Sequence, residues 1–321
     1  RGRGAAGKVA VFGILKRVGK VMSIQDKLSV KQKLQQYVES DFYREHATGS
    51  EKSPYWDQHS SAIKYNVNND TVSVTGSSGY TRPYTLDRPK CMVEVDGISL
   101  IDRQLAVLQT EGLEDIVMIG GYKAEMLRRY GVKLKINPRY YETNMVWTLF
   151  CAEDELEGEV IVSYGDIVYS REILQSLLQS KADIAVTIDK DWKSYWSARN
   201  EYPLNDAETL KLREDETIIE IGQKPRSLDE IEGQYMGLMK FKPDGLKYIK
   251  EIFHSAIESD EILSKPVKNA YMTDLLQSVI NSGYPVTSVS IHGGWVEIDT
   301  VGDLESDVSL ERVRNIDLNL Y

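Results

Sequence analysis

Cysteine is scarce in this sequence, whose 321 residues include only Cys91 and Cys151. The two form no Cys-x-x-Cys pair and have no histidine cluster beside them, which excludes the common kind of structural zinc site. Two isolated thiols are typical of a protein from a reducing compartment. Long apolar runs are missing as well, because "VAVFGIL" is far shorter than the roughly 20 residues that span a bilayer and is interrupted by Gly13. We therefore expect a soluble, cytoplasmic protein.

Positive charge is also in deficit. The chain has 39 lysines and arginines against 49 aspartates and glutamates, a formal net charge of -10. Binding to nucleic acid requires a basic face that neutralises phosphates, so this balance argues against a nucleic-acid partner. The hydrophobic fraction of 41% is sufficient for a substantial core, and the length fits one large α/β domain or two smaller ones.

The N-terminal part differs in character from the rest. Residues 1–23, "RGRGAAGKVAVFGILKRVGKVMS", are basic and resemble a short segment of insertion-sequence transposases that carries no catalytic carboxylate. The spacing of apolar residues predicts a helix over 26–46, and residues 62–74 are typical of a hairpin that turns at Asn69 and Asp70. We predict that residues 1–70 are an appendage and that residues 71–321 form the functional domain.

From about residue 90 the pattern of strands and helices becomes regular. Ser99 is a helix cap and Gly112 a helix end, and the short run 70–74 is predicted as the strand that opens the α/β unit. Such alternation predicts a mostly parallel central sheet with helices on both faces, in which ligands bind beyond the carboxyl ends of the strands. We expect strands at 91–95, 115–122, 132–137, 159–166 and 182–189, and helices at 100–111, 123–131, 144–156 and 171–180.

Basic and acidic residues lie in the loops selected by that rule. Arg82, Arg88 and Lys90 follow a glycine-rich stretch that begins at Gly76, which predicts an anionic ligand in an otherwise acidic chain. Asp166 follows a strand and is either a helix cap or a ligand for a hard cation. A second carboxylate, Asp299, favours the cation, since Mg²⁺ takes one or two carboxylates and fills its other positions with water and phosphate oxygens.

Seven motifs occur in an order that resembles a known family over residues 81 to about 310. They are "RPYTLDRPKCMVEVDGISLIDRQL", "IGGYKAEML", "NMVWTLFCAEDEL", "VSYGDIVY", "IGQKP", "GQYMGLMKF" and "WVEIDTVGDLE". The set is similar to nucleotidyltransferases that activate small amino-phosphorus compounds, especially 2-aminoethylphosphonate cytidylyltransferases and the bacterial type of phosphocholine cytidylyltransferase. This resemblance implies a Rossmann-like nucleotidyltransferase fold, CTP as the donor, Mg²⁺ as the cofactor and a CMP-linked product.

The resemblance also implies roles for particular residues. Lys90 would contact the triphosphate, Asp166 and Asp299 would hold the metal, and Glu297 would bind the ammonium of the substrate. Glu297 and Asp299 are two residues apart in a segment predicted to be extended, so we expect both on the same face. The candidate catalytic residues are Lys90, Asp166 and Arg82, and the candidate nucleotide-binding residues are Gly76, Lys90, Gly120, Gly121, Tyr122 and Ser163.

The organic substrate is specified less well by the sequence. Asn144 is a helix cap or a substrate ligand, Trp147 is more typical of the core, and His292 is typical of the surface. An anionic phosphonate or phosphate oxygen needs no general base to attack phosphorus, which suits a chain with 4 histidines. The remaining candidates for substrate binding are Asp189, Lys190, Lys224, Gln234 and Tyr235, with Trp192 and Trp196 as further aromatic candidates for an alkylammonium.

The opening loop departs from the family pattern. Ser78 stands where the pattern has its second glycine, and Tyr80 stands where it has an arginine that grips the triphosphate, which predicts weak catalysis. Two alternatives stay open: a sugar-1-phosphate nucleotidylyltransferase, and a nucleotide-binding protein with impaired turnover. A NAD-dependent enzyme is disfavoured because no G-x-G-x-x-G opens a helix. The sequence leaves the oligomeric state and the choice between CTP and UTP open.

Overall fold

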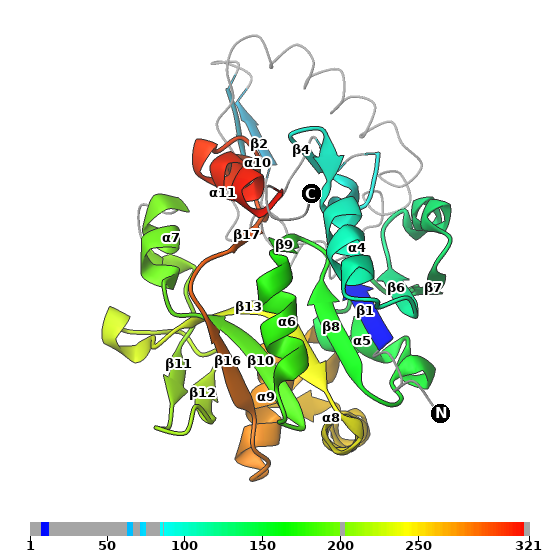
Figure 1. The fold of residues 1–321 in the computed structure, drawn as a ribbon, viewed down its shortest axis with the longest axis vertical. Helices are drawn as coiled ribbons and strands as arrows, with labels where there is room; N and C mark the ends of the chain where they lie inside the picture. Colours follow the sequence, from blue (N-terminus) through cyan, green and yellow to red (C-terminus); the bar gives the residue numbers. More distant parts are fainter. Residues whose placement is uncertain are drawn as a thin grey trace.

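A seven-stranded sheet forms the centre of the protein (Figure 1). The computed structural model describes residues 8–12, 63–66, 71–74, 84–85, 87–199 and 203–317. Neighbouring strands of the sheet run parallel, except that β13 is antiparallel to both of its neighbours, β10 and β8. The strands lie in the order β16 (Thr287–Ile291), β10 (Ile184–Asp189), β13 (Gln234–Phe241), β8 (Val160–Tyr164), β1 (Lys8–Phe12), β6 (Ile116–Gly120) and β7 (Lys133–Ile136).

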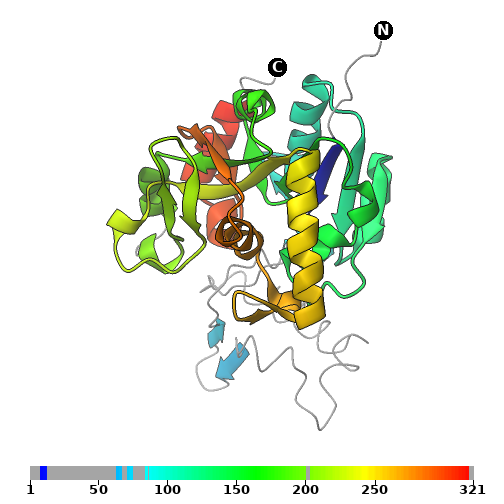
Figure 2. The same cartoon turned by 90° about the horizontal axis from the view of Figure 1, so that it is seen from below.

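Helices cover both faces of this sheet (Figure 1, Figure 2). α4 (Leu100–Thr110) and α6 (Arg171–Gln179) lie on one face, and α5 (Met145–Phe150), α8 (Pro243–Ser259) and α9 (Met272–Asn281) lie on the other. Every residue of β6, β8 and β10 is buried, as expected for continuous apolar strands enclosed between two helical layers. The predicted α/β class and the mostly parallel sheet are therefore confirmed.

None of the helices in the described part of the chain has the length and apolar character required to cross a bilayer.

Shorter elements surround the sheet and provide the loops at its carboxyl edge. The shorter elements are β2 (Ile63–Asn66), β3 (Thr71–Val74), η1 (Lys90–Met92), β4 (Glu94–Val95), β5 (Ile98–Ser99), η2 (Ala124–Tyr130), η3 (Glu153–Glu155), β9 (Ile167–Tyr169), α7 (Trp192–Arg199), η4 (Pro203–Asn205), β11 (Leu210–Leu212), β12 (Ile218–Ile221), η5 (Leu228–Glu230), β14 (Glu261–Ile262), β15 (Lys265–Pro266), η6 (Val267–Asn269), β17 (Trp295–Glu297), α10 (Val301–Leu304) and α11 (Asp307–Asp317).

The first strand of the sheet is not the one that we predicted. β3 was expected to open the α/β unit, but it pairs with β2 in a separate antiparallel hairpin. The hairpin itself was predicted correctly. The place between β8 and β6 is taken by β1, with Ala10 aligned to Val162 on one side and to Val117 on the other. Lys8–Phe12, which we assigned to an appendage, therefore belong to the central sheet.

Two predicted boundaries also differ from the structure. The strand expected over 91–95 is reduced to β4, because residues 90–92 form the short helix η1 after Pro89. The helix expected over 144–156 ends at Phe150 and is followed by η3. The helix expected over 123–131 is a 3-10 helix, η2. The predicted ends of α4 are confirmed, since the Ser99 side chain caps it by accepting from the amide of Asp102, and Gly112 follows that helix with a φ of 74°. The helix predicted over 26–46 lies outside the described residues.

Candidate active site

Lys90, Asp166 and Asp299 meet at the carboxyl edge of the sheet. The Lys90 ammonium lies 2.7 Å from Oδ2 of Asp166 and 2.7 Å from Oδ1 of Asp299. Lys90 begins η1, Asp166 lies in the turn between β8 and β9, and Asp299 lies between β17 and α10. The structure thus brings together three residues from distant parts of the chain that the sequence analysis assigned to one site.

The pairing of two short strands explains how the two carboxylates come together. β17 pairs with β9, so that Glu297 is aligned with Ile167. The ladder continues for one more bond, because the amide of Ile298 donates to the carbonyl of Asp166 at 2.9 Å. Asp299 therefore follows directly after a residue that is bonded to Asp166 itself. The main-chain ladder fixes the separation of the two carboxylates more firmly than two loops could.

Burial makes the charges of this cluster interact strongly. The side chains of Lys90, Asp166 and Asp299 are 2%, 5% and 13% exposed. Burial by itself would lower the pKa of Lys90, but the carboxylates of Asp166 and Asp299 outweigh it and raise that pKa above its usual value. Lys90 is therefore a cation at every physiological pH. Two carboxylates and one ammonium leave the cluster with a net negative charge, which favours a further cation.

The same residues fit a magnesium ion. Oδ1 of Asp166 is buried and makes no hydrogen bond within the described structure, so one carboxylate oxygen of the cluster is still available as a ligand. Hard oxygen donors are the ligands that Mg²⁺ prefers, and one or two carboxylates suffice when a triphosphate supplies the other ligands. No group of three or more histidine, cysteine, aspartate or glutamate side chains in the described ranges is placed to hold a metal. The chemistry of the donor set is thus compatible with a hard cation such as Mg²⁺.

Arg199, at the end of α7, was missed by the sequence analysis. Its guanidinium donates from Nε to Oδ1 of Asp303 at 2.8 Å, from Nη2 to Oδ2 of Asp303 at 3.1 Å, and from Nη1 to Oε2 of Glu297 at 3.0 Å. Glu297 is the last residue of β17, and Asp299 lies two residues beyond it. Glu297 and Asp299, which we expected on the same face, have different partners, Arg199 for Glu297 and Lys90 for Asp299.

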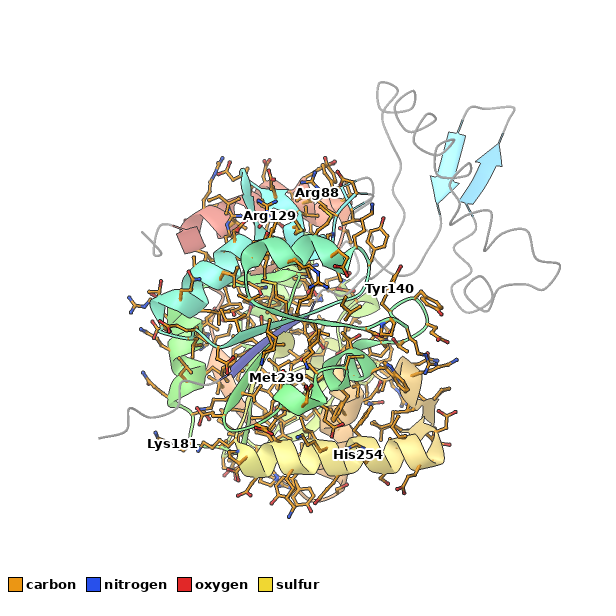
Figure 3. All side chains as sticks on the ribbon, turned by 90° about the vertical axis from the view of Figure 1, so that its right-hand side faces the viewer. Arg88, Arg129, Tyr140, Lys181, Met239 and His254 are labelled. Carbon is orange, nitrogen blue, oxygen red and sulfur yellow. The ribbon has the colours of Figure 1, made fainter. Side chains whose placement is uncertain are left out.

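Packing explains two of the glycines that we expected to approach the nucleotide. A Cβ atom on Gly120 would lie 2.7 Å from the Cβ of Ala124, and one on Gly121 would lie 2.3 Å from the Cβ of Tyr140. Tyr140 lies on the loop after β7 (Figure 3) and meets the ring of Tyr122 edge to face, with ring centroids 6.3 Å apart. Glycine is therefore required at both positions by their neighbours, and contact with a nucleotide stays a prediction there and at Tyr122.

Several predicted ligands are buried in structural hydrogen bonds. Asp189 is completely buried, and its carboxylate accepts from the amides of Asp191 and Gly293 and from Nε1 of Trp295. Gln234 is buried, and its side-chain amide accepts a hydrogen bond from the amide of Glu208 and donates one to the carbonyl of Glu208. Ser163 is completely buried as well, and its hydroxyl donates to the carbonyl of Tyr164. These contacts do not support a direct role of Asp189, Gln234 or Ser163 in ligand binding.

The other candidates keep more access to solvent. Lys190 is 3.9 Å from Glu216, and Lys224 donates to the carbonyl of Leu204. The ring of Tyr235 meets that of Tyr164 edge to face at 5.7 Å, close to the Asp166 turn. Asn144 is the helix cap that we had as one alternative, since its side chain accepts from the amide of Met145.

The aromatic candidates are mostly core residues. Trp192 and Trp196 are each 4% exposed and do not face solvent, contrary to the prediction that they are available to an alkylammonium. Trp147 packs against the core, as expected, and His292 is exposed, as expected. Gly76 and Arg82, with Ser78 and Tyr80 of the altered loop, lie outside the described residues.

Two hollows in the described surface lie apart from the Lys90 cluster. One, of about 710 Å³, runs beside α8 and is lined by residues that include Lys247, Lys250 and His254; Figure 3 shows His254 on that helix. The other, of about 340 Å³, is lined by residues that include Tyr84 and Glu305. Neither hollow is lined by Lys90, Asp166 or Asp299. The candidate site is therefore identified by the charged side chains that meet there and not by the shape of the surface.

The fold and this cluster define the protein as a nucleotidyltransferase. Residues 82–220 match the MobA-like NTP transferase domain. Over 254 residues the chain is 38% identical to the CTP:phosphoglutamine cytidylyltransferase of Campylobacter jejuni subsp. jejuni serotype O:2, an alignment that covers 75% of this chain and 99% of that protein. The chain therefore belongs to the MobA-like NTP transferases and, among them, to the cytidylyltransferase family.

A further relative agrees with this assignment, and a solved structure agrees with the fold. The choline-phosphate cytidylyltransferase of Streptococcus pneumoniae is 29% identical over 113 residues, which cover 34% of this chain and 49% of that protein. The solved structure of the inositol-1-phosphate CTP transferase from T. maritima has a TM-score of 0.58 and 19% identity, and the match covers 74% of this chain and 91% of that one. The first match confirms the predicted resemblance to cytidylyltransferases, and the second confirms the fold.

Proposed function

We propose that this protein transfers CMP from CTP to a small amine-bearing phosphate or phosphonate and releases pyrophosphate. The observation that carries the proposal is the convergence of Lys90, Asp166 and Asp299 within 2.7 Å contacts at the carboxyl edge of the sheet, where α/β folds bind their ligands. The membership in the cytidylyltransferase family supports CTP as the donor.

The proposed reaction needs no general base from the protein. A phosphate or phosphonate oxygen of the acceptor is already anionic at neutral pH, so it attacks the α-phosphorus of CTP without losing a proton. A bond forms between this oxygen and the α-phosphorus while the bond from the α-phosphorus to the oxygen bridging to the β-phosphorus breaks, and pyrophosphate leaves with the bonding electrons. Catalysis by the chain then consists of positioning the reactants and stabilising charge.

Lys90 is the residue to which we assign the stabilisation of charge. A protonated lysine directed at the transferring phosphoryl group lowers the barrier because the negative charge that moves onto the leaving group meets a fixed cation. Asp166 and Asp299 would hold Mg²⁺, which supplies further positive charge against the triphosphate when bound. Without nucleotide, the two carboxylates hold Lys90 in place as their shared cation.

For the acceptor, we propose a small phosphorus compound that carries an amino or a quaternary ammonium group. The relative that the chain covers almost completely is named for phosphoglutamine, and another is named for choline phosphate. Both names denote small nitrogen-containing acceptors, which agrees with the resemblance to 2-aminoethylphosphonate cytidylyltransferases. Glu297 stays our candidate for the ammonium of the acceptor, although in this structure its carboxylate is bound by Arg199.

Pyrophosphate release tests both the donor and the acceptor. We expect release from CTP and not from UTP, with phosphoglutamine, 2-aminoethylphosphonate or phosphocholine as the acceptor. Glucose 1-phosphate is the comparison acceptor, and the Lys90→Ala variant is the control for a contaminating enzyme. Equal rates with glucose 1-phosphate would favour the sugar-1-phosphate alternative. Binding of CTP without release, with every acceptor, would favour a nucleotide-binding protein whose turnover is impaired by its altered opening loop.

A further inference from the structure

Arg199 is a buried cation that lies beside the active-site cluster and is not part of it. Its side chain is 5% exposed, and its guanidinium lies over the rings of Tyr195 and Trp196 at 5.1 Å and 5.3 Å from their centroids. All the hydrogen bonds given above for Arg199 go to Glu297, at the end of β17, and to Asp303, in α10. A buried arginine with two carboxylate partners is costly to desolvate, so its geometry has to be well defined for it to be retained.

The Asp303 carboxylate connects Arg199 to the main chain of Asp299. Oδ2 of Asp303 accepts from the amide of Asp299 at 3.1 Å and from the amide of Thr300 at 2.8 Å, in addition to Nη2 of Arg199. The Thr300 side chain in turn accepts from the amide of Asp303, which completes a capping box at the start of α10. α10 has only four residues, and both the capping box and Arg199 bind Asp303 within it.

Helix α7 also binds the other end of the same segment. The hydroxyl of Tyr195 accepts from the amide of Glu297 at 3.0 Å and donates to the carbonyl of Glu297 at 3.3 Å. Tyr195 and Arg199 are four residues apart, so they project from the same side of α7. The helix thereby holds the chain on both sides of Asp299, at Glu297 and at Asp303.

We propose that Arg199 is a positioning residue for the cation site: through Asp303 it fixes the main chain of Asp299, so that the Asp299 carboxylate stays beside Lys90 and Asp166. The proposal rests on the proposed function in one respect, because it takes Asp166 and Asp299 as the carboxylates that hold the metal. Partners that orient metal ligands typically contribute a factor of roughly 10 to 100 to metal affinity.

Arg312 provides a matched control. The guanidinium of this arginine on α11 lies 3.9 Å from the centroid of the Tyr195 ring, which Arg199 also contacts, and its Nε donates to the carbonyl of Trp295 at 3.0 Å. Arg312→Met therefore removes an arginine from the same aromatic group without removing a donor to Asp303. A general loosening of the region would affect Arg312→Met and Arg199→Met alike, whereas the positioning role affects Arg199→Met selectively.

The experiment uses the full chain and Mn²⁺ alone as the probe, with free Mn²⁺ measured by electron paramagnetic resonance. We expect Arg199→Met to weaken Mn²⁺ binding roughly tenfold or more, Arg199→Lys to recover part of it because a lysine still pairs with Asp303, and Arg312→Met to stay close to the wild type. Amide hydrogen exchange at Asp299 and Thr300, measured by NMR without metal, is expected to accelerate in both Arg199 variants and not in Arg312→Met.

The outcomes separate the two hypotheses. If Asp166→Asn and Asp299→Asn bind Mn²⁺ as the wild type does, the metal site itself is wrong, and the exchange rates still decide whether Arg199 positions Asp299. If Asp299→Asn weakens binding but the Arg199 variants behave as Arg312→Met does in both measurements, the positioning role is overturned. Should Arg199→Met fail to fold, Arg199→Lys decides: wild-type Mn²⁺ affinity together with wild-type exchange at Asp299 rejects the proposal.

Discussion

The ammonium of Lys90 lies 2.7 Å from Oδ2 of Asp166, although 76 residues separate them in the chain. Both side chains are nearly inaccessible to solvent. Without ligand, then, the lysine assigned to the triphosphate is the counter-ion of the carboxylates assigned to the metal. Binding of nucleotide and metal together would replace both halves of this pair, since the phosphates provide the lysine with a new anion and the metal provides the carboxylates with a new cation. We therefore expect nucleotide and metal to bind cooperatively.

Replacing Lys90 with methionine tests this double role. Turnover is expected to fall roughly 100-fold to 1,000-fold, the usual cost of removing one group that stabilises the transition state. Stability is expected to fall by about 3–5 kcal/mol, because Asp166 and Asp299 lose their shared cation. Added Mg²⁺ should stabilise this variant more than the wild type, because the metal replaces the lost charge. Pyrophosphate release measures the turnover, and urea denaturation with and without Mg²⁺ measures the loss of stability and its recovery.

The pH dependence of the same stabilisation has a definite sign. The pKa of Lys90 is raised in the folded state. The contribution of Lys90 to the free energy of unfolding is therefore complete below its pKa in the unfolded chain, about 10.4, and is lost only as the pH rises above that pKa. The contribution of Lys90 itself is thus constant from about pH 6 to 9. Lys247→Met, which removes an exposed lysine of α8, is the control. A Lys90→Met variant as stable as Lys247→Met would refute the internal counter-ion.

Replacing Asp166 or Asp299 with asparagine is expected to make CTP binding independent of Mg²⁺. The amide keeps the shape of the side chain but removes the negative charge that attracts the ion. Calorimetric titration of CTP, with and without Mg²⁺, gives the measurement, and Asp244→Asn, on the exposed start of α8, controls for a general change in charge. Magnesium-dependent CTP binding of wild-type strength in both variants would remove these residues from the metal site.

Gly121 allows packing and nucleotide contact to be separated. Gly121→Ala places a Cβ 2.3 Å from the Cβ of Tyr140, and we expect the crowding to cost about 1–3 kcal/mol of stability. The double variant Gly121→Ala with Tyr140→Gly removes the clash and should regain part of that stability. If the nucleotide also approaches this loop, CTP affinity stays lower in the double variant, by roughly tenfold for a loss of about 1.4 kcal/mol. Recovery of full CTP affinity in the double variant would assign Gly121 to packing alone.

The strands with long apolar runs could be predicted from the sequence, and the opening strand could not. β6, β8 and β10 are buried on both faces, so their composition alone identifies them. The runs 8–12 and 70–74 are both short and β-branched, and only pairing with β6 and β8, more than a hundred residues away, distinguishes the first of them. The β-strand propensity of a segment depends on its tertiary contacts, so propensity alone does not identify which run joins the central sheet.

The site was predictable where residue type alone carries the chemistry. Lys90, Asp166 and Asp299 were selected by their charges, by their places at the ligand side of the expected sheet and by the resemblance to cytidylyltransferases. Arg199 had no such signal, because its partners lie 98 and 104 residues away in the chain. The same-face expectation for Glu297 and Asp299 stays a prediction, and it gave no indication that Arg199 binds one of them and Lys90 the other. An arginine next to Tyr195 and Trp196 on a short helix is the feature that could have indicated a buried ion pair.

The last prediction concerns Cys91, which follows Lys90 in η1 and is buried. Burial raises the pKa of its thiol to about 12, above the unfolded value of about 8.5. At pH 8, about four units lower, the thiolate fraction is roughly 10⁻⁴, and only the thiolate reacts with disulfide reagents. We expect Cys91 in a Cys151→Ser variant to react with 5,5′-dithiobis(2-nitrobenzoate) only as fast as the protein unfolds.

The sign of the associated pH dependence follows from the same shift. Because the folded pKa of Cys91 exceeds the unfolded one, its contribution to stability is complete below about pH 8.5 and is lost as the pH rises from there toward 12. Cys91→Ser, which leaves the half-buried Cys151 as the reporter, is expected to react faster. Since Cys91 shares η1 with Lys90, the Lys90→Met variant should also expose the Cys91 thiol and accelerate its labelling. Rapid labelling of Cys91 in the folded wild type would show that η1 opens freely, and the carboxylates would then not hold Lys90 as their counter-ion.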